Sequence, residues 1–199
     1  MKKTLTLALA FVLVAALAIG GTVAYLTATT GDVVNTFTVG NVALTLDEKD
    51  FDNDDPNAPR VKTNEYKLIP GSEYEKDPTV HVTAGSEACY VFVKVENGLG
   101  AAEKASGDNG YVTIADQIAA NGWTAVPGHA GYFYKTVDAA TAEAGTDLVV
   151  FEEFGISGTV SQDDYAALAS ANITIKACAV QSEGLSTAEA AFEYCPDEF

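Results

Sequence analysis

Apolar residues recur at every second position in several short stretches of the chain, which is the period of a β-strand with one buried face. Val42, Leu44 and Leu46 follow this period. A longer stretch has two apolar faces. Cys89, Val91, Val93 and Val95 lie on one, and Tyr90 and Phe92 lie on the other. Further strands are expected at Thr79–Val82, Gly131–Thr136, Leu148–Phe151 and Asn172–Val180. Short strands separated by Gly, Pro and Asn favour a mostly β fold, an antiparallel β-sandwich.

Three segments have the features of short helices instead. Residues 113–120 place Ile114 and Ile118 four positions apart and end at Asn121-Gly122, a helix stop. Ser161 precedes Asp164 by three residues, the spacing of a capping box, and opens a second helix. Ser186 and Glu189 have the same spacing and predict a last helix through about Tyr194. Because helices this short are marginal alone, they are expected to lie at the periphery of the sandwich.

The N-terminus has the layout of a secretory signal peptide. Lys2 and Lys3 are followed by the apolar stretch Leu5–Ile19, and Thr22-Val23-Ala24 supplies small residues for cleavage. Cleavage between Ala24 and Tyr25 is therefore predicted, with export from the cell. The alternative is an uncleaved membrane anchor, because no charged residue occurs between Lys3 and Asp32.

These signals divide the chain into a signal peptide (1–24), an N-terminal segment (25–37) and one β domain (38–199). No later stretch is apolar for 18 residues, so contact with a membrane is expected only before signal cleavage. The domain is predicted to be secreted and to act outside the cell or at its surface.

The charge of the chain is strongly negative. Eleven Lys and Arg residues stand against 28 Asp and Glu residues, for a net charge of −17. Loss of the leader leaves nine basic residues and a net charge of −19. Nucleic acid is excluded as a partner, since neutralising phosphates requires clustered Lys and Arg.

No catalytic motif is evident in the sequence. The only histidines are His81 and His129, and there is no His-Glu-x-x-His to build the usual zinc site of a metalloprotease. A zinc site made from both histidines and a distant carboxylate stays open. No catalytic residue and no cofactor are predicted.

An acidic run, Asp47–Asp55, holds six carboxylates in nine residues. Asp50, Asp52 and Asp54 match the first three ligands of a calcium loop, although the sixth position is not glycine and the twelfth is not glutamate. An EF-hand is thus excluded, whereas a looser calcium site at these three residues stays open. The alternative is a solvated loop without a ligand.

Three cysteines cannot all pair within one chain. Cys89 shares its face with apolar residues and is expected to be a buried thiol or a core disulfide partner. Cys178 lies on the outer face of its strand, and Cys195 follows a helix that could fold over that face. A Cys178–Cys195 disulfide would close a 17-residue loop and contribute about 3 kcal/mol. Three free thiols, or a disulfide between subunits, are the alternatives.

Aromatic residues invite a further alternative, a monomeric surface module that binds sugars. Trp123, Tyr132, Phe133 and Tyr134 lie close together in the sequence and could form a stacking platform. Aromatic residues along sandwich strands are, however, usually core residues or cross-strand pairs.

Several blocks resemble one family of secreted proteins. The specific ones are Gly20-Gly-Thr-Val-Ala-Tyr-Leu-Thr27 and Asn35-Thr-Phe-Thr-Val-Gly-Asn-Val-Ala-Leu-Thr-Leu46. Less specific blocks follow at residues 68–71, 76–80, 89–95, 173–177 and 179–181. Together they resemble the TasA/camelysin family of Gram-positive bacteria, whose members are cut by a dedicated signal peptidase of the SipW type.

The resemblance implies a jelly-roll sandwich that assembles into biofilm-matrix fibres, as a homopolymer with possible matrix or anchor proteins. It also implies that residues 25–37, free after cleavage, add as a strand to the sheet edge of a neighbouring subunit. The residues of this predicted assembly strand are Tyr25, Leu26, Val33, Val34 and Phe37. Alternatively, the segment is the domain's own first strand or is disordered. Some family members are described as metallopeptidases, so a camelysin-like surface peptidase is the competing function.

Overall fold

The computed structural model describes residues 41–53, 55, 57–196 and 199. The chain separates into two compact units, Met1–Thr38 and Val39–Phe199, and every described residue belongs to the second.

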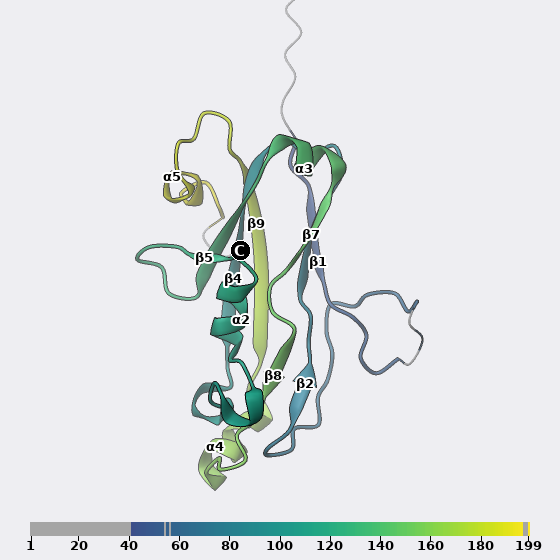
Figure 1. Cartoon of the computed structure of the whole chain (residues 1–199), viewed down its shortest axis with the longest axis vertical. Coiled ribbons are helices and arrows are strands. Elements are labelled where there is room, and N and C mark those ends of the chain that lie inside the picture. Colours follow the sequence, from purple (N-terminus) through teal and green to yellow (C-terminus); the bar gives the residue numbers. More distant parts are fainter. Residues whose placement is uncertain (1–40, 54, 56, 197–198) are drawn as a thin grey trace, which may run out of the picture. The chain divides into compact units, whose positions relative to one another are not determined.

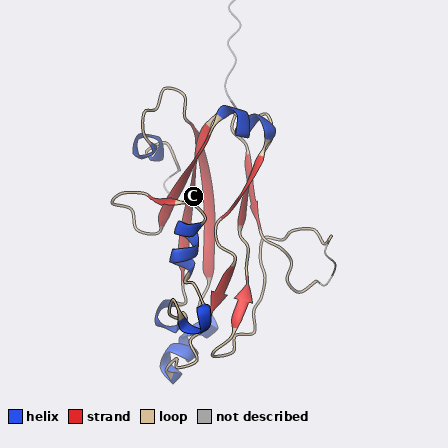
Figure 2. Ribbon diagram, viewed as in Figure 1, coloured by secondary structure: helices blue, strands red, loops and turns tan. Residues whose placement is uncertain are grey.

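The described residues form antiparallel sheets with a few short helices (Figures 1 and 2). One sheet has the strand order β1-β3-β7, with bounds Leu44–Asp47, Thr79–Val82 and Thr146–Val149. A two-stranded sheet pairs β2 (Glu73–Glu75) with β8 (Glu153–Gly155). The largest sheet has the order β5-β6-β4-β9, with bounds Thr124–Ala125, Tyr132–Val137, Cys89–Asn97 and Ile173–Gln181. The prediction of a mostly β, antiparallel fold is therefore confirmed.

The alternation in β4 separates two clusters of buried side chains. Cys89, Val91 and Val93 are fully buried and pack in one cluster with Val80 and Val82 of β3, between the two larger sheets. Phe92 faces the other way, into a smaller cluster that contains Ala188 and Ala191 of the C-terminal helix. The two faces predicted for this strand are those observed.

The helices are α2 (Ile114–Ala120), α3 (Ala139–Ala144), α4 (Gln162–Ala167) and α5 (Ala188–Phe192). The cap predicted at Ser161 is correct, since its hydroxyl accepts from the N–H of Asp164. At the first helix Thr113, which was not predicted as a cap, accepts from the N–H of Asp116. The cap predicted for the last helix is wrong by one residue. Thr187, not Ser186, accepts the hydrogen bond, from the N–H of Ala190.

The strand predicted at Leu148–Phe151 begins and ends two residues earlier. Val150 and Phe151 are completely buried, and Val150 donates its N–H to the carbonyl of Pro78 after the strand has ended. Their apolar character reflects burial in the core after the strand has ended, not membership of the strand. Strands β2 and β8 were not predicted, because three residues are too few to show a period.

Candidate functional site

Each sheet ends in strands that have one edge without a strand partner in the part of the chain that the structure describes, and two of these end strands border the candidate site. They are β1 in the β1-β3-β7 sheet and β9 in the four-stranded sheet. The two strands contact one another, so both open edges lie on the same side of the fold. An open edge offers main-chain donors and acceptors to an added strand.

The hydrogen bonds that flank β9 show which of its backbone groups are free. Gly98 donates to the carbonyl of Asn172, and Ser182 donates to that of Ala88, each between directly paired residues. In an antiparallel pair such bonds recur at every second residue. The residues between them, among them Ile175 and Ala177, therefore point their N–H and C=O groups toward the open edge.

A groove of about 1320 Å³ runs between these edges. Its apolar lining comes from both strands and from the segments that connect them: Leu44, Leu46, Tyr66, Leu68, Phe154, Leu168, Ile173 and Ile175. The side chains that β1 and β9 contribute pack against the main core but stay only partly buried. The groove thus combines free backbone edges with an incompletely covered apolar floor.

The opposite side of the fold is closed by side chains. Trp123 donates its Nε1–H to the carbonyl of Val149 at 2.8 Å, and the amide of Asn121 donates to that of Val150 at 3.3 Å. These two donors occupy the carbonyl groups at and just after the end of β7. At the edge of the other sheet, β5 is only two residues long. Short or capped edges resist the addition of another strand. Strand addition is consequently favoured on the β1–β9 side.

Arg60 lines the groove and connects the acidic loop after β1 to strands β1 and β3. Its guanidinium lies 2.5 Å from the Asp47 carboxylate and 2.9 Å from that of Asp77, and it also donates to Thr79 Oγ1. Burial opposes ionisation of Asp47, but hydrogen bonds from Arg60 and His81 together with their charges lower its pKa. This network holds the start of the loop against β1 and β3.

His81 lies on the outer face of β3, between two carboxylates. Its ring nitrogens lie 2.9 Å from Asp47 and 2.6 Å from Asp147. Both nitrogens are thereby occupied by carboxylates, which is the environment of a charged imidazolium and not of a zinc ligand. His129 lies elsewhere, against the rings of Tyr132 and Phe192. The structure does not bring the two histidines into one cluster.

The calcium hypothesis concerns Asp50, Asp52 and Asp54, of which Asp54 lies outside the described residues. The Asp50 carboxylate accepts the N–H of Asp52 at 3.2 Å, and the side chain of Asp52 is exposed. Among described residues, no group of three or more His, Cys, Asp or Glu side chains could hold a metal ion.

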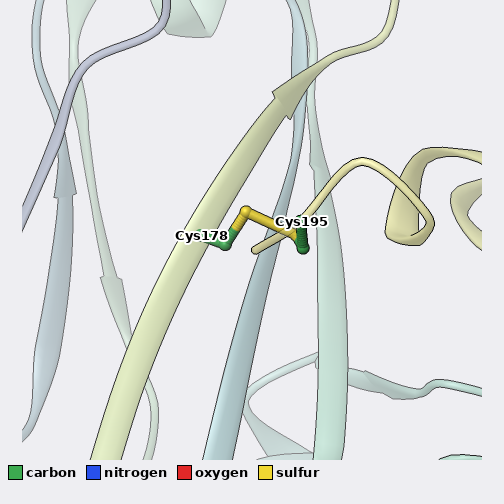
Figure 3. Close-up of a disulfide and its surroundings, with 2 residues drawn as sticks. All are labelled: Cys178 and Cys195. Atoms are coloured by element: carbon green, nitrogen blue, oxygen red, sulfur yellow. A yellow bond between two sulfur atoms is a disulfide. The ribbon is translucent and has the colours of Figure 1, made fainter. Parts of the chain in front are cut away.

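Cys178 on β9 and Cys195 after α5 form a disulfide, with Cα atoms 6.1 Å apart (Figure 3). This is the pairing that the sequence suggested. The bond holds the C-terminal segment over the outer face of the four-stranded sheet, where Phe192 and Phe199 contact Tyr132. Cys89 is a buried free thiol.

The four aromatic residues proposed as a sugar platform do not share one surface. Trp123 is buried, and Phe133 packs against the main core. Tyr132 and Tyr134 belong to the smaller cluster on the other face of the sheet. No common stacking surface results from this arrangement.

The remaining candidate residues lie outside the described part of the structure. They are the cleavage residues Ala24 and Tyr25 and the other assembly-strand residues, Leu26, Val33, Val34 and Phe37. Across residues 41–199, apart from the few positions not described, no helix is long and apolar enough to cross a bilayer.

Comparison of the chain with protein families, with curated proteins and with solved structures finds no match.

Proposed function

We propose that the chain is a secreted structural subunit of extracellular fibres, with a jelly-roll domain of the TasA/camelysin type. A signal peptidase of the SipW type cuts after Ala24, and residues 25–37 of one copy add as a strand along β9 of the next. The observation that carries this proposal is the apolar groove between the open edges of β1 and β9.

The segment is long enough to cover β9, and its composition suits strand addition. An extended segment of 13 residues spans roughly 43 Å, whereas the nine residues of β9 span roughly 30 Å. The segment contains a single charged residue, Asp32, and it is rich in Thr and Val without proline. It can therefore supply both backbone hydrogen bonds to β9 and apolar side chains to the groove.

Growth of a fibre follows from the position of the groove. A donor segment at one site and an acceptor groove at another make a head-to-tail contact, and such contacts extend into filaments when their rotation does not close. Because the other sheet side is capped by Trp123 and Asn121, each subunit offers one acceptor. A linear, unbranched fibre is the expected product.

The test compares protein that starts at Tyr25 with protein that starts at Thr38, by negative-stain electron microscopy and size-exclusion chromatography. Filaments are expected from the first protein alone. Monomers of both, at every concentration, would overturn the proposal. Monomers of the longer protein with a protected β9 edge in hydrogen exchange would instead show that the segment occupies its own groove.

A pair of variants tests whether the donor strand of a neighbouring subunit binds in the groove. Ile175→Lys places a charge in the groove, and Ile69→Lys adds the same charge at an exposed residue that does not line it. We expect filaments from the second variant and none from the first. Ala177→Pro removes a donor that faces the open edge and not β4, so it should also stop assembly while the domain stays folded.

A further inference from the structure

Three polar side chains that line the groove contact one another. Glu48, directly after β1, pairs with the ammonium of Lys76 through Oε2. Its other oxygen, Oε1, accepts the side-chain amide of Asn64 at 2.9 Å. One carboxylate therefore holds a primary amine and a carboxamide, the two groups that can condense to a secondary amide.

Glu48 and Lys76 of this trio are buried, whereas Asn64 is half-buried. The side chains of Glu48 and Lys76 are only 5% and 9% exposed. The backbone of Glu48 exchanges two hydrogen bonds with Val61, at 2.8 and 2.7 Å, and the N–H of Lys76 donates to the carbonyl of Glu152. Within this pair the Glu48 carboxylate is the group placed to accept a proton from the Lys76 ammonium.

The amide of Asn64 is also polarised for attack. Its carbonyl oxygen accepts the N–H of Phe51 at 3.2 Å, and its nitrogen donates both to Glu48 and to the carbonyl of Lys49. An N–H donor at the carbonyl stabilises the oxyanion that forms when a nucleophile adds. Once Glu48 has taken up a proton, its position at the nitrogen lets it protonate the leaving group.

We propose that Lys76 and Asn64 are joined by an intramolecular isopeptide bond whose formation Glu48 catalyses. Glu48 takes a proton from the Lys76 ammonium, and the lone pair of the neutral Nζ adds to Cγ of Asn64. Glu48 passes this proton to Nδ2, which leaves as ammonia when the Cγ–Nδ2 bond breaks and the carbonyl re-forms. The remaining extra proton on Nζ returns to Glu48. Atoms and charge balance without an oxidant or a further reactant.

The bond would restrict the motion of the segment that lines one side of the groove. Asn64, Lys76 and Glu48 all line it, and the cross-link closes the loop from 64 to 76, which also contributes Tyr66 and Leu68 to the lining. The constraint is covalent and lies next to the proposed strand-binding edge. It persists in denaturant and under reducing conditions, unlike the Cys178–Cys195 disulfide.

The test is the intact mass of the purified, reduced protein. We expect a mass about 17 Da below that of the sequence, which is the ammonia released. Trypsin should then yield Thr63–Lys67 joined to Leu68–Lys94, because a modified Lys76 is not cleaved. Full mass together with a free peptide Leu68–Lys76 would overturn the proposal, whether or not the protein forms fibres.

The masses of three variants distinguish the isopeptide bond from other reactions that release ammonia. Lys76→Arg keeps a cation beside Glu48, and Asn64→Ala keeps the ion pair, yet both should show full mass. A cyclic imide formed by Asn64 alone also loses ammonia, and persistence of the deficit in Lys76→Arg would overturn the proposal. Glu48→Gln should show full mass too, and it is interpreted only if it folds.

A second lysine–glutamate pair provides the matched control. Lys104 is 3% exposed and lies 2.5 Å from Glu73, but the side-chain amide of Asn97 donates to Glu103 and not to Glu73. Glu73→Gln should therefore leave the 17 Da deficit of the Lys76–Asn64 bond unchanged, about one ammonia per chain. Loss of the deficit in this variant would contradict the assignment to Glu48.

Discussion

The imidazole of His81 on β3 lies 2.6 Å from the carboxylate of Asp147 on β7. The other ring nitrogen lies 2.9 Å from Asp47 on β1, so one side chain connects all three strands of this sheet. A charged imidazolium between two carboxylates holds β1, the open wall of the groove, to the rest of the sheet.

This relationship predicts that stability depends on pH. Burial alone would lower the pKa of His81, but its hydrogen bonds to Asp147 and Asp47 and their charges raise it above 6.5. The charged His81 therefore adds to the free energy of unfolding in full below the unfolded-state pKa of about 6.5. This stabilisation is lost as the pH rises through the higher folded-state pKa. His81→Gln should cost about 1 kcal/mol more at pH 5.5 than at pH 9.5 in urea unfolding. An equal cost at both pH values would contradict a charged His81.

Arg60 is expected to stabilise the loop through the shape of its guanidinium and not its charge alone. It contacts Asp47, Asp77 and Thr79 at once, with a side chain 31% exposed. Because lysine cannot reproduce this fork, Arg60→Lys should lower the free energy of unfolding by about 1 kcal/mol. Limited proteolysis should then cut more rapidly within residues 49–61. Lys62→Arg, at a neighbouring exposed position, is the control and should leave both measurements unchanged.

The disulfide is predicted to hold the C-terminal helix in place. Cys178→Ser should lower stability by about 3 kcal/mol, the loop entropy that a bridge of this span removes from the unfolded chain. Release of α5 should expose Phe92 and its neighbours and increase the binding of a hydrophobic dye. In the unmodified protein only Cys89 is free; burial raises its pKa, so it should react with thiol reagents only on unfolding. Rapid reaction of two further thiols would show that the bridge is absent.

Assembly should accelerate on acidification if the proposed function is correct. A mature charge of −19 keeps subunits apart at neutral pH, with screening over roughly 8 Å in physiological salt. Protonation of carboxylates removes this repulsion. Fibre yield should increase from pH 7 to pH 4.5, measured by light scattering and checked by electron microscopy. A yield that does not change over this range would count against the role of charge.

Local features of the fold could be predicted from the sequence because they depend on residues close together in the chain. The faces of β4 follow from the alternation at residues 89–95, since successive side chains of a strand point to opposite sides. The cap at Ser161 is likewise encoded within four residues. The outward position of Cys178 followed from the same alternation, and it suggested the correct disulfide partner.

The tertiary structure alone decided which distant residues meet. The pairing of β2 with β8, the burial of Val150 and Phe151 after β7, and the groove between β1 and β9 depend on contacts between segments far apart in the sequence. Glu48, Asn64 and Lys76 carry no joint signal in the sequence, because their spacing is irregular and each is an ordinary polar residue. Only packing of the loop against the sheet buries Glu48 and Lys76 and places the amine and the amide on one carboxylate.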